Sequence, residues 1–219
     1  MPHARKPRTP GAILAAGLAP LVLLAISGRA DATTLRKMDL PELVSLADRV
    51  VHARVLDQTV YWNESRTQIH TDTTFEVLDQ AKGDGPATLT VTLFGGRIDP
   101  LEMREEGTPI FETGEEVVLF ASLRPDGKNN LAGFSQGVMR VEVEEASGVK
   151  FAMSEVPVGV DFVEASGTLL VPVRPSPLRA RLSSLLDEVR RMTTGQTVPG
   201  PAWSPVAETP ATVEEGQNP

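Results

Sequence analysis

The pentapeptide GFSQG, residues 133–137, resembles a catalytic motif more closely than any other string in this chain. It fits the pattern G-x-S-x-G, in which a hydrolase serine lies on a sharp turn between a strand and a helix. The segment that follows, VMRVEVEE, alternates apolar and polar residues with period two, which predicts a strand instead of a helix. The hydrolase order also requires a histidine after the serine, and none follows His70. We therefore predict that Ser135 is an ordinary member of a barrel strand, with Gly133 and Gly137 marking a bend in it.

A second arrangement of catalytic residues stays open. A chymotrypsin-like order would combine His52 or His70, Asp72 or Asp99, and Ser135. Only their geometry can decide this, and the residues beside Ser135 differ from the G-D-S-G-G string of such proteases. One functional hypothesis is therefore a secreted hydrolase that uses Ser135 or the carboxylates of the acidic central loop. It is the alternative to the binding function predicted below. We expect no catalytic residue.

The residues that bind metals in proteins do not cluster in this sequence. In the hairpin register described below, His52 and His70 would lie six strand positions apart, about 20 Å, so they cannot share one ion. The acidic residues of the central loop lack the tight alternate spacing of a calcium loop. They are Asp99, Glu102, Glu105, Glu106, Glu112, Glu115 and Glu116. The absence of cysteine removes thiolate nucleophiles and thiolate zinc ligands, and we expect no metal and no cofactor.

Four residues are our candidates for contacts with a partner. Tyr61 and Trp62 stand together at the tip of a predicted hairpin, and adjacent aromatic residues can form a contact surface. Arg97 and Asp99 lie in the long connection from Gly95 to Gly114, which has no clear period. The tip and the long connection are therefore the two candidate surfaces.

The element that must position the aromatic pair is a hairpin of two β-branched, alternating segments, 50–62 and 67–79. With a turn at Asn63–Arg66, position i pairs with position 128 − i. His52 then pairs with Glu76 and His70 with Gln58. The apolar pairs are Val51 with Val77, Ala53 with Phe75, and Val55 with Thr73.

The remaining periodicity predicts further short strands and two helices. Strands are expected at 88–94, 115–123, 130–137, 138–145, 148–153 and, as an edge strand with Pro172, 168–173. A helix that begins after Asp39 has a capping box with Glu42, and a second helix is expected over 177–192. We expect one short helical turn within 95–114. The fold class is mainly β, a small OB-like antiparallel barrel with an N-terminal and a C-terminal flanking helix. An open sandwich is the alternative.

The order of short motifs supports this fold. The strings LADRVVHARV, FEVLDQAKGDG, GEEVVLF and GFSQG follow one another over residues 35–145. In this the chain resembles a family of uncharacterised exported bacterial proteins. It is similar, more distantly, to the OB-fold barrel of tissue inhibitors of metalloproteinases and netrin-type modules. Those inhibitors depend on an N-terminal cysteine and on disulfides, which this chain lacks. The resemblance therefore implies the barrel and no inhibitory residue.

The two ends of the chain predict export and a single domain. A basic start, an apolar run over 11–26 and the site Ala30-Asp31-Ala32 are typical of a signal peptide, residues 1–32. A retained signal anchor is the alternative, although 16 residues are short for a membrane span. We expect one barrel domain over 33–192 and a disordered tail, rich in Pro and Thr, over 193–219. The exported protein would be periplasmic or extracellular.

Charge narrows the range of partners. The full chain carries a formal net charge of −8, and removal of residues 1–32 takes away four basic residues and one acidic residue, which leaves −11. Such a surface repels nucleic acid and anionic lipid. We predict an exported non-enzymatic binding module whose partner is a protein or an envelope component, with no stable membrane span after signal cleavage. A structural envelope protein is the third alternative.

Overall fold

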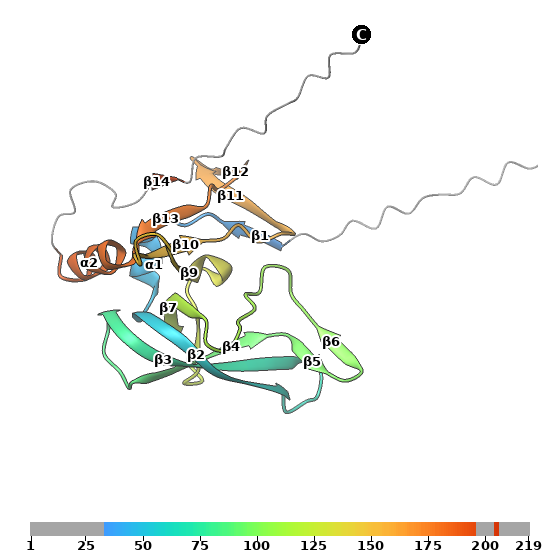
Figure 1. Ribbon diagram of the computed structural model, residues 1–219. Helices are drawn as coiled ribbons and strands as arrows, with labels where there is room; N and C mark the ends of the chain where they lie inside the picture. Colours follow the sequence, from blue (N-terminus) through green and yellow to red (C-terminus); the bar gives the residue numbers. More distant parts are fainter. Residues whose placement is uncertain (1–32, 196–203, 206–219) are drawn as a thin grey trace, which may run out of the picture. The chain divides into compact units, whose positions relative to one another are not determined.

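The computed structural model describes residues 33–195 and 204–205, and this part of the chain is mainly β (Figure 1). The predicted signal peptide and most of the predicted tail lie outside the described residues. The helices are α1 (Leu40–Leu46), α2 (Leu182–Thr193) and the short 3-10 turn η1 (Phe134–Gly137). The strands are β1 (Thr33–Arg36), β2 (Arg49–Trp62), β3 (Ile69–Lys82), β4 (Thr88–Phe94), β5 (Gly96–Ile98), β6 (Leu101–Met103), β7 (Glu116–Leu123), β8 (Asn129–Leu131), β9 (Val138–Val143), β10 (Lys150–Ser154), β11 (Val160–Ser166), β12 (Leu169–Val173), β13 (Leu178–Arg181) and β14 (Ser204–Pro205).

Five strands close into a barrel in the order β7-β2-β3-β4-β8, and β8 pairs back onto β7. All these pairs are antiparallel except β4 with β8, which run parallel where Val91 faces Asn129. This is the arrangement of an OB-fold barrel, so the predicted fold class is confirmed and the open sandwich is excluded. The sheet continues from β7 through β9, β10, β13 and β14.

The register of the β2–β3 hairpin differs from the predicted one by two residues at Ala53 and Val55 and by three residues from Asp57 to Trp62. Ala53 pairs with Val77 and Val55 with Phe75. Two features cause the difference. The connection spans residues 63–68, because the side chain of Asn63 accepts the backbone N–H groups of Thr67 and Gln68, and a bulge follows Val55. At Ala53 and Val55 a shift of two residues keeps each side chain on its face, so the predicted apolar face is inside the barrel there. Beyond the bulge the shift is three residues, and Gln58 pairs with the buried Thr73 in place of His70.

Two hydrophobic clusters lie on the two faces of the sheet. The barrel interior holds, among others, Val51, Val55, Phe75, Val91 and Leu119. The other cluster joins both helices to the outside of β2 and β7, through Val50, Phe120, Leu43, Leu185 and Val189. Because β2 contributes to both clusters, its residues from Arg49 to Ala53 are all buried. The two helices therefore flank the barrel, as predicted.

The ends of the helices agree in part with the predictions. The capping box of α1 forms as expected, with Asp39 accepting the backbone N–H of Glu42 and Glu42 accepting that of Asp39. The C-terminal helix, however, begins at Leu182, and Leu178–Arg181 form strand β13 against β10. The prediction of helix from 177 was wrong because the open edge of β10 takes up this segment, with Ala180 buried between two arginines.

The segment 95–114 holds no helical turn, contrary to prediction. Its first part is the hairpin β5–β6, which turns at Asp99–Pro100. Gly95 and Gly96, with φ of 107° and 138°, lead the chain into this hairpin, and other residues rarely adopt these angles. The hairpin lies beside the end of β2–β3 (Figure 1), because Gly96 packs against Val60 and Thr71.

The structure has a second sheet, β1-β11-β12, of which only the edge strand β12 was predicted. The segment with Pro172 forms β12 at the edge, as expected. The parallel pair of β1 with β11, from Thr33↔Val160 to Arg36↔Val163, had no local signal in the sequence. Within the described residues, no helix has both the length and the apolar character needed to cross a bilayer.

Candidate functional site

The aromatic candidates Tyr61 and Trp62 lie at the end of β2, where adjacent side chains point to opposite faces. The hydroxyl of Tyr61 donates to Asp72 Oδ1 at 2.9 Å and accepts from Lys128 Nζ at 2.9 Å, and the Tyr61 ring stacks on His70. The hydrogen bond to Tyr61 raises the pKa of Lys128. Tyr61 is therefore part of a bonded network, and the two aromatic residues do not form one continuous surface.

Arg97 and Asp99 lie in the β5–β6 hairpin, both largely exposed. Arg97 Nε donates to Asp99 Oδ1 at 2.7 Å, so the two charges offset each other. By strand alternation Trp62 shares the face of Val60, against which the hairpin packs. The structure therefore places Arg97 and Asp99 on the face of the β2–β3 pair that carries Trp62, and not on the face that carries Tyr61.

The two histidines are far apart, and among the described residues neither is hydrogen-bonded to a serine. His52 pairs in register with Asp79 and His70 with Tyr61, in place of the predicted Glu76 and Gln58. Tyr61 stands nine positions beyond His52 on β2, so the two histidines are further apart than predicted. Among the described residues, no group of three or more His, Asp or Glu side chains could hold a metal ion.

His52 belongs to an ion cluster centred on Glu116. The carboxylate of Glu116 lies 2.8 Å from His52 Nε2, 2.6 Å from Lys150 Nζ and 3.1 Å from Arg54 Nη2. Burial alone would raise the pKa of Glu116, but the hydrogen bonds from Lys150, Arg54 and His52 outweigh it and lower the pKa to about 2. This geometry links β2, β7 and β10 and leaves His52 with a carboxylate partner.

The GFSQG segment is a 3-10 turn between β8 and β9, so the prediction that Ser135 lies in a strand was wrong. The chain does bend there. Gly133 has φ of 67°, and a Cβ on Gly137 would lie 2.3 Å from the carbonyl oxygen of Ala132. Gln136 accepts the backbone N–H of Met38 at 2.8 Å and donates to the carbonyl of Arg36 at 3.0 Å. The turn thus fixes the start of the chain to the barrel.

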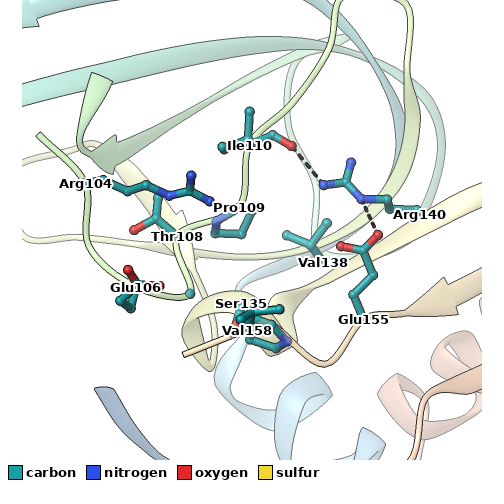
Figure 2. A pocket seen from close by; sticks show the side chains of 12 residues that line it. Arg104, Glu106, Thr108, Pro109, Ile110, Ser135, Val138, Arg140, Glu155 and Val158 are labelled. Atoms are coloured by element: carbon teal, nitrogen blue, oxygen red, sulfur yellow. Dashed lines mark hydrogen bonds and ion pairs between the residues drawn. The ribbon is translucent and has the colours of Figure 1, made fainter. Parts of the chain in front are cut away.

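Ser135 itself faces a polar pocket of about 500 Å3, which we call the Ser135 pocket (Figure 2). Its walls come from the long loop, the GFSQG turn, strand β9 and the segment after β10. They are Arg104, Glu106, Gly107, Thr108, Pro109, Ile110, Ser135, Val138, Arg140, Glu155, Pro157 and Val158. The Ser135 hydroxyl is buried and has no hydrogen-bond partner among the described residues, and the same holds for Thr108.

A smaller cavity of about 210 Å3 adjoins it at the mouth of the barrel, and we call it the barrel-mouth pocket. It is lined mainly by apolar side chains, including Val60, Leu93, Phe94, Met103 and Phe111. The two cavities share the wall Arg104, Thr108, Pro109 and Ile110. We call them together the double pocket.

The two arginines of the Ser135 pocket have different surroundings. Arg140 donates to Glu155 at 2.8 Å, to the carbonyl of Ile110 at 2.8 Å and to Glu115, so every guanidinium nitrogen is engaged. Within the part of the chain that the structure describes, Arg104 makes no hydrogen bond or ion pair. A guanidinium with free donors can bind a carboxylate through two parallel hydrogen bonds.

No significant match to this chain is found among protein-family models, curated proteins or solved structures. The resemblance to exported bacterial proteins and netrin-type modules therefore stays a prediction. The sequence pointed to the long connection but not to Arg104 or Thr108, which belong to no motif. Their importance depends on contacts between segments distant in the chain.

Proposed function

We propose that this chain is an exported, non-enzymatic OB-barrel module that binds a protein or an envelope component through the double pocket. The observation that carries the proposal is the shared wall of the two cavities. It contains a guanidinium and a hydroxyl, Arg104 and Thr108, that have no partner among the described residues. A concave site with apolar walls and a few convergent polar groups is typical of ligand sites.

The surroundings of Ser135 favour binding over hydrolysis. An activated serine needs a base within hydrogen-bond reach. Across residues 33–195, no hydrogen bond joins any two members of the triad candidates His52, His70, Asp72, Asp99 and Ser135. His52 is instead engaged by Glu116.

The predicted signal peptide and the charge of −11 after its removal support a partner outside the cytoplasm that is neither nucleic acid nor anionic lipid. Of the two surfaces expected from the sequence, the long connection is the better supported. It lines both cavities, whereas the Tyr61 side is held in a network of its own.

Site-directed photo-crosslinking tests the proposal. A photoreactive side chain at Ile110, which is 57% exposed in the shared wall, should crosslink a partner in cells that export the protein. The same group at Leu46, which is 51% exposed on α1, is the matched control and should not. Equal crosslinking from both positions, or none from Ile110, would contradict the proposal.

A further inference from the structure

The free charges of the Ser135 pocket indicate what it can attract. Arg140 is paired with two carboxylates, Glu155 and Glu115, and its remaining nitrogen donates to the carbonyl of Ile110, so it has no free donor. Figure 2 shows the Arg104 side chain running toward Pro109, while Glu106 lies at the edge of the pocket. The carboxylate of Glu106 is next to Gly159, where an added Cβ would meet it at 2.7 Å. Among the described residues, the lining therefore carries two charges without a hydrogen-bond or ion-pair partner, the cation Arg104 and, at the edge, the anion Glu106. Arg104 is the one with free donors.

Two hydroxyls belong to the lining of the Ser135 pocket, Thr108 in the wall shared by the two cavities and Ser135 in the GFSQG turn. Thr108 Oγ1 and Ser135 Oγ are buried without a hydrogen-bond partner in the described part of the chain. A buried hydroxyl without a partner costs free energy, so a rotation that turns either oxygen from the wall toward a ligand loses no hydrogen bond among the described residues. Each can then donate one hydrogen bond to an oxygen of the ligand. A guanidinium fork with two hydroxyl donors suits a carboxylate.

The barrel-mouth pocket suits a different group. Its volume of about 210 Å3 corresponds to about seven water molecules in the liquid. A branched or aromatic side chain is of this size, and Phe94 and Phe111 in the wall would offer it apolar contacts. Because the two cavities share Arg104 and Thr108, the charged group and the apolar group must be close neighbours in the ligand.

We propose that the ligand of the double pocket is a peptide segment in which a carboxylate stands next to a large apolar side chain. The carboxylate binds Arg104, Thr108 and Ser135, and the apolar side chain enters the barrel mouth. This inference rests on the proposed binding function and adds the class of ligand. The carboxylate comes either from a chain terminus or from an acidic side chain, since both present the same oxygens.

Fluorescence polarisation with labelled peptides tests the ligand class. The first probe, Gly-Ser-Gly-Phe-Leu with a free C-terminal carboxylate, represents a terminus. The second, Gly-Ser-Phe-Asp-Gly amide, represents an acidic side chain. The amidated first peptide lacks the carboxylate, and its Ala-Ala version lacks the apolar groups. We expect at least one of the first two probes to bind at least tenfold more tightly than either control.

Protein variants then connect binding to the residues. Arg104→Gln should weaken the binding of the probe at least tenfold, and Arg104→Lys should weaken it less. Ser135→Ala should weaken the binding severalfold. Arg66→Gln, at another arginine without a partner among the described residues, should leave affinity unchanged. Equal affinity with and without the carboxylate, or equal affinity for wild type and Arg104→Gln, would overturn the ligand class.

A failure of this inference can be told apart from a failure of the proposed function. If no probe binds while Ile110 still crosslinks a partner, the ligand class is wrong and the binding function stands. If no probe binds and Ile110 crosslinks nothing, both are wrong.

Discussion

Glu155 accepts a 2.8 Å hydrogen bond from Nε of Arg140, and this ion pair closes the Ser135 pocket on the side away from Arg104 (Figure 2). Through its other nitrogens Arg140 also holds the carbonyl of Ile110 and the carboxylate of Glu115. One arginine of the pocket thus holds the long loop to the barrel, and the other has free donors.

This contrast predicts different stabilities for two matched variants. Arg140→Gln should lower the free energy of unfolding by about 2 kcal/mol, because two carboxylates and a carbonyl lose a partly buried donor. Arg104→Gln should change it by less than about 0.5 kcal/mol, as is usual for exposed residues without partners. Urea denaturation of both variants measures this. Equal losses would contradict the assignment of the two roles.

A second pair of variants, at Ser135 and Gln136 in the GFSQG turn, should also differ in stability. Ser135→Ala should leave the unfolding free energy unchanged or slightly raised, because its hydroxyl has no hydrogen-bond partner among the described residues. Gln136→Ala should lower it by about 1–2 kcal/mol, since the hydrogen bonds to Met38 and Arg36 are lost. Thermal unfolding checks the order. A serine-reactive fluorophosphonate should not label the wild type, and labelling that disappears in Ser135→Ala would establish a hydrolase instead.

Two glycines with nearly equal positive φ allow the cost of packing to be measured apart from the cost of backbone strain. Gly133 and Gly148 have φ of 67° and 69°. A Cβ on Gly133 would lie 2.7 Å from Leu43 and 2.9 Å from Met38, whereas Gly148 has open space. Gly148→Ala should therefore cost only the left-handed strain, about 1 kcal/mol. Gly133→Ala should cost more than Gly148→Ala, because the ends of the Leu43 and Met38 side chains must move aside to make room. Denaturation curves with equal midpoints would contradict the packing at the turn.

The structural elements that could be predicted from the sequence are those marked by a pattern of neighbouring residues. The barrel strands follow from β-branched alternation, and α1 follows from the spacing of Asp39 and Glu42. The register of the hairpin was not predictable in the same way, because it depends on the Asn63 loop and on a bulge after Val55. Leu178 illustrates the same limit. It fits the apolar stripe of the predicted C-terminal helix, yet it lies in strand β13, which pairs with the free edge of β10.

The double pocket was beyond the reach of local reasoning for a different reason. Its walls come from segments near Arg104, Ser135 and Val158, which meet only in the folded chain. No spacing rule connects them. The aromatic pair at the hairpin tip had a local signal, but its two side chains belong to opposite faces of one strand.

Glu116 predicts a dependence of stability on acid pH. Its pKa is lowered from 4.5 to about 2 in the folded protein, so its ion pairs stabilise fully above the unfolded pKa and are lost as pH falls through the folded one. Glu116→Gln should cost about 2 kcal/mol at neutral pH, because Lys150, Arg54 and His52 lose their carboxylate partner. That cost should shrink steadily between pH 4.5 and pH 2. Urea denaturation at several pH values measures it, and a cost independent of pH would refute the cluster.

The central claim is that Arg104 is the anchor of a binding site under the long loop. Photo-crosslinking from Ile110 in the Arg104→Gln background tests it most directly, with Arg66→Gln as the matched background. We predict that the adduct seen in the wild type is lost in Arg104→Gln and kept in Arg66→Gln. An adduct of equal yield in all three proteins would contradict the claim.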